Sequence, residues 1–252
     1  SYTDRNKVQV LKNVSFGVRR GMIFGIAGVQ GTGQVELSDL MTRKRAVREG
    51  DIRLNGTSIK KLSIQEIRKM QFGYVPEDRI EQGIAGQESI AENMVSNRYA
   101  TSEFCRGGLL DYKKIEEFAD ENIQEYEIRC SGNKQKVGML SGGNMQKVVV
   151  ARECSHDPQV LIAEQPTRGV DVGAAHIIHK KIMELRNEGC AVLLVSADLS
   201  EALKLSDVIA VMYEGEIVAY FDNTEGLNEE KLGLYMLGLE RHSEEQIRRA
   251  RG

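Results

Sequence analysis

The sequence predicts an α/β fold with a mostly parallel sheet, and the second half of the chain carries this prediction. Short apolar runs at Val160–Ala163 and Ala191–Val195 have the length of buried strands. Between them, Gly173–Asn187 has the length and periodicity of a helix. Strands that alternate with helices are typical of a parallel sheet with helices on both faces.

The remaining elements follow from local patterns of apolar and turn residues. Alternation over Val8–Arg19 predicts strands with one buried face. Asn55-Gly56 after Asp51–Leu54 predicts a strand that enters a tight turn. By the same reasoning we expect strands at Met22–Ala27, Phe72–Val75, Val208–Met212 and Ile217–Tyr220, and helices at Glu36–Glu49, Ile64–Met70, Tyr112–Tyr126, Asn144–Ser155 and Ser200–Leu205.

The predicted domain organisation follows from a change after residue 80, where the sequence becomes polar and helical. We expect a single domain over residues 1–252, with an α/β core and an antiparallel β subdomain formed by residues 1–80 and 139–222. Residues 81–138 are polar and helical with no β-rich run, so they predict an inserted helical subdomain. Residues 223–252 predict a helical, charged tail. Because the sequence begins with serine, we expect it to be part of a longer protein.

Composition excludes several classes of function. The formal net charge of −3 argues against general binding to nucleic acid or to an anionic membrane. No apolar run approaches the roughly 20 residues of a spanning helix, so contact with a membrane would require a partner protein. No secretory signal is visible. The scattered cysteines fit the reduced state expected in a cytoplasmic protein. The four cysteines form no CxxC pair, so we expect reduced cysteines and no metal site.

A glycine-rich loop follows the predicted strand Met22–Ala27. Residues 28–35 read G-V-Q-G-T-G-Q-V, and a strand before them with a helix after them is the context of a P-loop, whose backbone N–H groups surround an anion. In a working NTPase a lysine and then a hydroxyl follow the last glycine, but Gln34 and Val35 stand there. The loop residues expected to contact nucleotide are Gly28, Val29, Gln30, Gly31, Thr32, Gly33, Gln34 and Val35.

A second pattern suited to phosphate is L-S-G-G-N at Leu140–Asn144, before a helix expected to begin near Asn144. The Ser141 hydroxyl and the free N–H groups of the first helical turn suit an anion. An ordinary helix N-cap explains the same residues. Downstream, Val160–Asp171 reads V-L-I-A-E-Q-P-T-R-G-V-D, an apolar strand that ends in an acid, which is the Walker B arrangement.

Together these motifs resemble the ATP-binding subunits of ATP-binding-cassette (ABC) transporters. Three local matches resemble the importers for simple sugars and nucleosides: G-I-A-G at Gly25–Gly28, V-P-E-D-R at Val75–Arg79, and the G-N-M-Q-K that continues the signature. The resemblance runs from about Val8 to about Asp222. In that family the subunit is a tandem of two cassettes, the second often degenerate, and this chain resembles the second.

The resemblance implies that several catalytic positions are altered. Glu164 stands at the Walker B aspartate position, and Gln165 stands at the general base, where an amide cannot accept a proton from water. Ala197 stands at the switch histidine, and Glu77 stands where most cassettes carry the Q-loop glutamine. The residues with which a cassette contacts the nucleotide of its partner cassette are intact. They are Ser141, Gly142, Gly143 and Asn144 of the signature, and Asp171 of the D-loop.

The resemblance further implies a head-to-tail pair of cassettes, with each ATP between one P-loop and the other signature. We expect this domain to complete a site whose P-loop, base and Mg²⁺ belong to a first cassette of the same polypeptide. At most, its own site would hold ATP weakly, with no metal and no hydrolysis. Permease subunits would contact Glu77–Glu92 at the inner face of the cell membrane, and a substrate-binding protein would act indirectly. The output would be uptake of a simple sugar or nucleoside, with no nucleic-acid partner.

Two alternatives remain open. One is a self-sufficient ABC ATPase that homodimerises, against which Gln34, Gln165 and Ala197 all count. The other is an ABC module that works outside transport, in translation or DNA maintenance. The negative net charge and the V-P-E-D-R segment argue against that second alternative.

Overall fold

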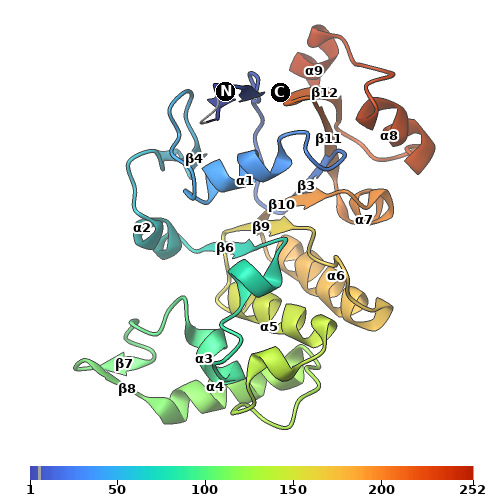
Figure 1. The fold of residues 1–252 in the computed structure, drawn as a ribbon. Coiled ribbons are helices and arrows are strands. Elements are labelled where there is room, and N and C mark those ends of the chain that lie inside the picture. Colours follow the sequence, from blue (N-terminus) through green and yellow to red (C-terminus); the bar gives the residue numbers. More distant parts are fainter. Residues whose placement is uncertain (5–6, 252) are drawn as a thin grey trace. The chain divides into compact units, whose positions relative to one another are not determined.

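The computed structural model describes residues 1–4 and 7–251, which fall into two compact units (Figure 1). The first unit comprises Ser1–Tyr74, Gln159–Gln165 and Arg186–Gly252, and the second comprises Val75–Pro158 and Pro166–Leu185. The second unit thus extends beyond the segment 81–138, whose role as a separate subdomain stays a prediction. Gly252, the end of the expected tail, lies outside the described residues.

The main sheet has six strands in the order β12-β11-β3-β10-β9-β6. β10 pairs in parallel with both β3 and β9, and β11 pairs in parallel with β3, whereas β12 is antiparallel to β11. The predicted, mostly parallel sheet is therefore confirmed. Its strands are β3 (Met22–Ala27), β6 (Phe72–Val75), β9 (Val160–Glu164), β10 (Ala191–Ser196), β11 (Val208–Tyr213) and β12 (Glu216–Phe221).

Two small antiparallel ladders lie in the first unit, formed by β1 (Tyr2–Thr3) with β2 (Gln9–Leu11) and by β4 (Arg53–Leu54) with β5 (Thr57–Ser58). Asn55 and Gly56 between β4 and β5 both have positive φ, as the expected tight turn requires. The prediction of strands over Val8–Arg19 is wrong beyond residue 11. The alternating side chains of that segment still pack against the core, but their backbone joins no described ladder.

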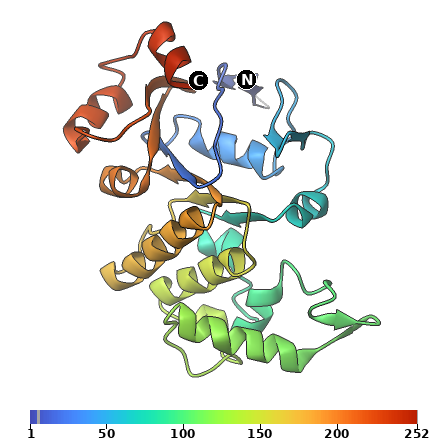
Figure 2. The ribbon, with the colours of Figure 1, turned by 180° about the vertical axis from the view of Figure 1, so that it is seen from behind.

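Five helices of the first unit are α1 (Gln34–Met41), α2 (Ile64–Lys69), α7 (Leu199–Leu205), α8 (Glu229–Met236) and α9 (Glu244–Arg251). The helix expected to reach Glu49 ends at Met41, because Arg43 takes a left-handed φ of 62°. The tail is two helices. α8 packs against β11 and α9 against β12, at the red end of the chain in Figure 2. No described helix is both long and apolar enough to cross a bilayer.

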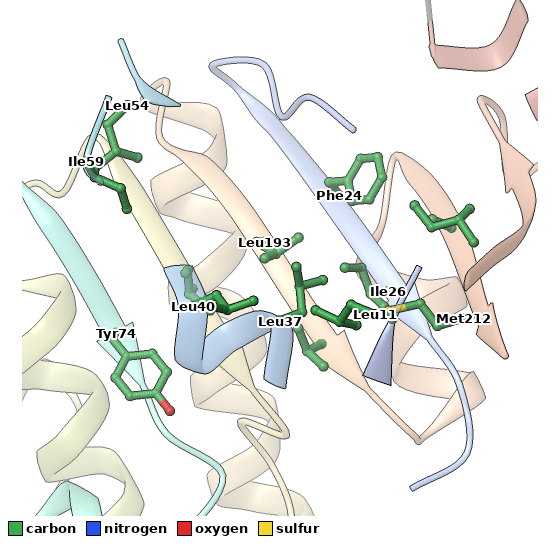
Figure 3. Close-up of a cluster of buried hydrophobic side chains, with 14 of the residues drawn as sticks. Leu11, Phe24, Ile26, Leu37, Leu40, Leu54, Ile59, Tyr74, Leu193 and Met212 are labelled. Atoms are coloured by element: carbon green, nitrogen blue, oxygen red, sulfur yellow. The ribbon is translucent and has the colours of Figure 1, made fainter. Parts of the chain in front are cut away.

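The core of the first unit lies between α1 and the main sheet. Leu37 and Leu40 of α1 are buried with Leu193 of β10, as Figure 3 shows. Phe24 of β3 stacks on Phe16 with ring centroids 5.0 Å apart. These contacts fix the start of α1, and therefore the loop before it, against the sheet.

The second unit is mostly helical. α3 packs against both α4 and α5. A hairpin of two-residue strands lies within the segment expected to lack a β-rich run. The elements are a π-helical turn at Arg79–Gly83, α3 (Ile90–Val95), β7 (Cys105–Arg106), β8 (Leu109–Leu110), α4 (Tyr112–Glu125), a 3₁₀ turn at Val137–Met139, α5 (Gly142–Cys154) and most of α6 (Val172–Asn187).

Leu193→Ala should lower the free energy of unfolding by about 3 kcal/mol, because the side chain is 1 % exposed and its loss leaves a cavity in the sheet core. Chemical denaturation of the two proteins measures this difference. Leu109→Ala is the matched control, since Leu109 is 77 % exposed and should tolerate the change. Equal losses for the two variants would contradict the assignment of Leu193 to the core.

Candidate nucleotide site and signature segment

The candidate residues of the first unit gather at one edge of the main sheet. The glycine-rich loop follows β3, Gln165 follows β9, and Ala197 follows β10. These three strands are parallel neighbours in the order β3-β10-β9, so their carboxyl ends meet at the same edge. In open α/β sheets this edge is where ligands bind.

The backbone of the glycine-rich loop suits an anion. Gly31 and Gly33 have φ of 90° and 103°, a region that glycine adopts without strain. Gly33 precedes α1 and supplies no side-chain cap, so the first N–H groups of α1 have no partner from a capping side chain. A methyl group added at Gly31 would meet nothing within 4 Å. The loop backbone thus has the conformation that the predicted role in binding phosphate requires.

The side chains that replace the lysine and the hydroxyl do not complete this cradle. Gln34 is 5 % exposed, and its Nε2 donates to the carbonyl of Ile26 at 3.4 Å. The same atom would lie 3.1 Å from a methyl group at Gly28, so the amide is packed under the loop. Val35 is exposed and apolar, and it offers no oxygen to a metal. The loop thus carries a buried neutral amide where a charged lysine would act.

Glu164 belongs to a network inside the first unit. It is 6 % exposed, and its Oε2 accepts a hydrogen bond from the Tyr74 hydroxyl. Lys44 in turn donates to that hydroxyl at 2.8 Å and lies 3.9 Å from Asp39. Burial raises the pKa of Glu164, although the Tyr74 hydrogen bond and the Lys44 charge act in the opposite direction. The residues are so far apart in the chain that no sequence pattern connects Lys44 or Tyr74 with the Walker B strand.

These residues do not fit a magnesium ion. A P-loop magnesium is held by a hydroxyl after the lysine and by the Walker B acid. Here the first position is Val35, and one oxygen of Glu164 is already bound by Tyr74. Within residues 1–4 and 7–251 no group of three or more His, Cys, Asp or Glu residues is placed to hold a metal.

Gln165 and Ala197, at the positions predicted for the general base and the switch histidine, contact each other. The backbone N–H of Ala197 donates to Oε1 of Gln165 at 3.2 Å, and the N–H of Gln165 donates to the carbonyl of Val195 at 2.8 Å. Gln165 has a φ of 44°, so the chain turns sharply as it leaves β9. The amide is oriented by backbone groups at the sheet edge, but it cannot serve as a general base.

The signature segment lies in the second unit at the start of α5. α5 begins at Gly142, two residues before the predicted start, because Ser141 is its N-cap. The Ser141 Oγ accepts from the Asn144 N–H at 3.5 Å and from Asn144 Nδ2 at 2.9 Å. The N-cap that was the alternative to a phosphate-binding role is therefore present, and the exposed serine at the positive end of a helix remains suited to phosphate.

Close packing explains the two glycines of the signature. A methyl group at Gly142 would lie 2.8 Å from Nη2 of Arg79, and one at Gly143 would lie 2.7 Å from Oδ2 of Asp171. Asp171 also accepts from the Ala174 N–H at 2.9 Å, which lowers the pKa of its carboxyl. The signature and the D-loop position are thus packed together within the second unit.

Glu77 also has a partner within the second unit. It forms an ion pair with Arg168 of the P-T-R-G segment. Sequence reasoning identified neither Arg168 nor the approach of Arg79 to the signature, and V-P-E-D-R was used only as a mark of resemblance. The structure therefore brings the predicted residues together in two sets, which are Gln34, Glu164, Gln165 and Ala197 in the first unit and Glu77, Ser141, Gly142, Gly143, Asn144 and Asp171 in the second.

Glu164→Gln should change the pH dependence of stability. Because folding raises the pKa of Glu164, the wild-type protein loses stability as the pH rises from the ordinary value of 4.5 through the raised value. Below that window both states are protonated and the effect vanishes. The variant should therefore become more stable than the wild type as the pH rises, as measured by urea denaturation between about pH 4 and 8. Glu49→Gln, at an exposed position, is the control, and parallel profiles for Glu164→Gln and the wild type would contradict the prediction.

Comparison with known proteins agrees with this geometry. The family model described as "ABC transporter" matches residues 11–168. The nucleoside import ATP-binding protein NupA of Lactococcus lactis is 40% identical over 228 residues, which are 90% of this chain and 45% of the relative. The guanosine import ATP-binding protein NupO of Bacillus subtilis is 40% identical over 235 residues, which are 93% of this chain and 46% of the relative.

A glucose import ATP-binding protein of Haloferax volcanii, TsgD13, is also 40% identical, over 94% of this chain and 44% of its own length. The chain thus spans about half the length of these relatives. Among solved structures, the dimeric cassette MJ0796 bound to ADP and Pi has a TM-score of 0.76 at 22% identity, over 90% of this chain and 96% of that one. That likeness shows the shared fold. The chain belongs to the ABC transporter family and has the fold of an ATP-binding cassette.

Proposed function

We propose that this chain is the second, degenerate cassette of an ATP-binding subunit that drives import of a simple sugar or nucleoside. The printed functions of its relatives support the substrate class, since they import nucleosides, guanosine and glucose. The chain matches about half of each relative, which agrees with a tandem whose first cassette lies in the same polypeptide.

The observation that carries the proposal is the difference between the two sets of site residues. At the sheet edge the lysine, hydroxyl and base positions hold Gln34, Val35 and Gln165. In the second unit Ser141 caps α5 with an exposed hydroxyl, and Asp171 is fixed by a backbone hydrogen bond. Groups that act on the chain's own nucleotide are altered, and groups that act on a partner's nucleotide are present.

In this proposal the two sets have different tasks. The N–H groups at the start of α1 hold phosphate weakly, because Gln34 contributes no charge, and Gln165 activates no water. Ser141 and the first N–H groups of α5 bind the phosphates of the nucleotide held by the first cassette. The magnesium ion bound there neutralises charge on the phosphates.

The remaining partners follow from the same proposal. Permease subunits contact Glu77–Glu92 and the neighbouring helices, so the cassette is peripheral on the cytoplasmic face of the membrane. A substrate-binding protein acts on the permease and not on this chain. No nucleic acid takes part, in keeping with the net charge of −3.

Ser141→Arg should abolish most ATP hydrolysis by the assembled importer, because a long side chain fills the space for the partner's phosphate. Removal of one phosphate-stabilising donor alone costs about 10²-fold in rate. Steady-state ATPase assays of the complex measure the loss. Ser102→Arg, at an exposed turn, is the control that adds the same charge elsewhere. Unchanged hydrolysis by the Ser141 variant would refute the proposed role in trans.

Gln34→Lys should tighten nucleotide binding to the purified chain by about tenfold to a hundredfold, because a charge-assisted hydrogen bond is worth about 1.5–3 kcal/mol. Turnover should stay negligible, since Gln165 still offers no base. Isothermal titration with ATP measures binding, and release of phosphate measures turnover. Gln124→Lys, on the exposed side of α4, controls for the added charge. Substantial recovery of hydrolysis by the single variant would show that the site is not degenerate in the way proposed.

A further inference from the structure

Arg79 of the V-P-E-D-R segment binds the backbone that leads to the D-loop. Its Nη1 donates to the carbonyl of Arg168 at 2.9 Å, and its Nη2 donates to the carbonyl of Gly169 at 3.4 Å. Two donors of one planar fork thus meet carbonyls of two successive residues. A guanidinium held in this way has a defined orientation, which a lysine ammonium could not reproduce.

The same guanidinium lies against the signature. The methyl group that any other residue would carry at position 142 would stand 2.8 Å from Nη2 of Arg79 and 3.6 Å from the carbonyl of Gly169. Gly142 is the first residue of α5 and follows Ser141 directly. Arg79 therefore joins three segments of the second unit: its own loop, the turn of the signature, and the backbone before Asp171.

Arg79 and Asp171 place opposite charges at the start of α5. A cation beside the N-terminus of a helix is unfavourable, because the free N–H groups there carry partial positive charge. The two carbonyl oxygens offset this repulsion and hold the guanidinium in place. A phosphate at the start of α5 would be attracted by the helix and by Arg79 and repelled by the Asp171 carboxylate beside Gly143. Nearby Arg168 is paired with Glu77, so it adds little to this field.

We propose that Arg79 is a positioning residue that holds the signature turn against the Arg168–Gly169 backbone. It thereby fixes the spacing between Ser141 and Asp171 that the partner's nucleotide meets. The proposal rests on the proposed function, because it assumes that the signature acts in trans.

A double-mutant cycle between Arg79 and Gly142 tests the proposal. Arg79→Gln removes the fork, and Gly142→Ala pushes the fork aside. Each variant should lower kcat of the assembled importer about tenfold, since small displacements at a reacting centre cost this much or more. The KM for ATP should change by less than about twofold, because a positioning role affects the transition state more than ground-state binding. The double variant should lose no more than either single variant, because both changes disrupt the same contact.

Losses that multiply to about a hundredfold in the double variant would overturn the proposal, because independent sites are additive in free energy. Arg79→Lys separates position from charge. It keeps the cation without the fork, so its kcat should stay close to that of Arg79→Gln, and full activity would overturn the proposal. Arg106→Gln, on the exposed β7–β8 hairpin, is the matched control and should keep the wild-type rate.

Thermal melts of each variant check folding. If Arg79→Gln does not fold, Arg79→Lys still decides the question by its kcat value. The outcome for Ser141→Arg distinguishes failure of the proposed action in trans from failure of the proposed role of Arg79. Loss of hydrolysis in Ser141→Arg with wild-type kcat in the Arg79 and Gly142 variants overturns only the role of Arg79. Wild-type hydrolysis in all of them overturns the action in trans and the positioning role together.

Discussion

The parallel pairing of β3, β10 and β9 is the constraint on which the candidate nucleotide site depends. The register aligns Ala27, Ser196 and Glu164 near the ends of their strands, so the loops that follow meet at one edge. This is why Gln165 and Ala197, more than thirty residues apart, share a hydrogen bond. Parallel strands must be joined by long crossover connections. The second unit is formed by two such connections, one between β6 and β9 and the other between β9 and β10.

The Glu164 network shows how the acid at the predicted Walker B position can be occupied by contacts other than a metal ion. A buried carboxylate is costly unless hydrogen-bonded and paired with opposite charge. Tyr74 supplies the hydrogen bond, and Lys44 supplies a cation through the same hydroxyl. The chain itself therefore supplies partners for this carboxyl group, although burial still raises its pKa. An acid that binds a metal needs its oxygens turned towards the ion, and that requirement competes with this internal pairing.

Much of the fold could be predicted, because its strongest signals are local. Continuous apolar runs mark β3, β9, β10 and β11, and the expected ends of these strands lie within one residue of those observed. The prediction of strands is wrong over residues 12–19 for a physical reason. Side-chain alternation reports which face is buried, as it is for Phe16, but it does not report whether a neighbouring strand is there to pair with.

The candidate site could be predicted only in part. Motif spacing located the loop, the signature and the residues after β9 and β10, because those chemistries depend on neighbours in sequence. The partners that orient them come from elsewhere in the chain. Lys44 follows α1, Tyr74 lies on β6, and Arg79 reaches Arg168 across some ninety positions. Such contacts are set by tertiary packing, and a single sequence contains no periodicity that reveals them.

The starts of helices α1 and α5 differ in what surrounds them. At α1 the residues at the predicted lysine and hydroxyl positions, Gln34 and Val35, carry no charge, and Glu36 in the first turn is acidic. At α5 a guanidinium lies beside the first turn, held by two carbonyls. Attraction to a polyanion grows with local positive charge and weakens without it. At α5 the Arg79 guanidinium attracts a polyanion and the Asp171 carboxylate beside Gly143 opposes it, whereas the first turn of α1 carries the acid Glu36. The proposed function requires such a difference, because in it α5, and not α1, meets the nucleotide that is hydrolysed.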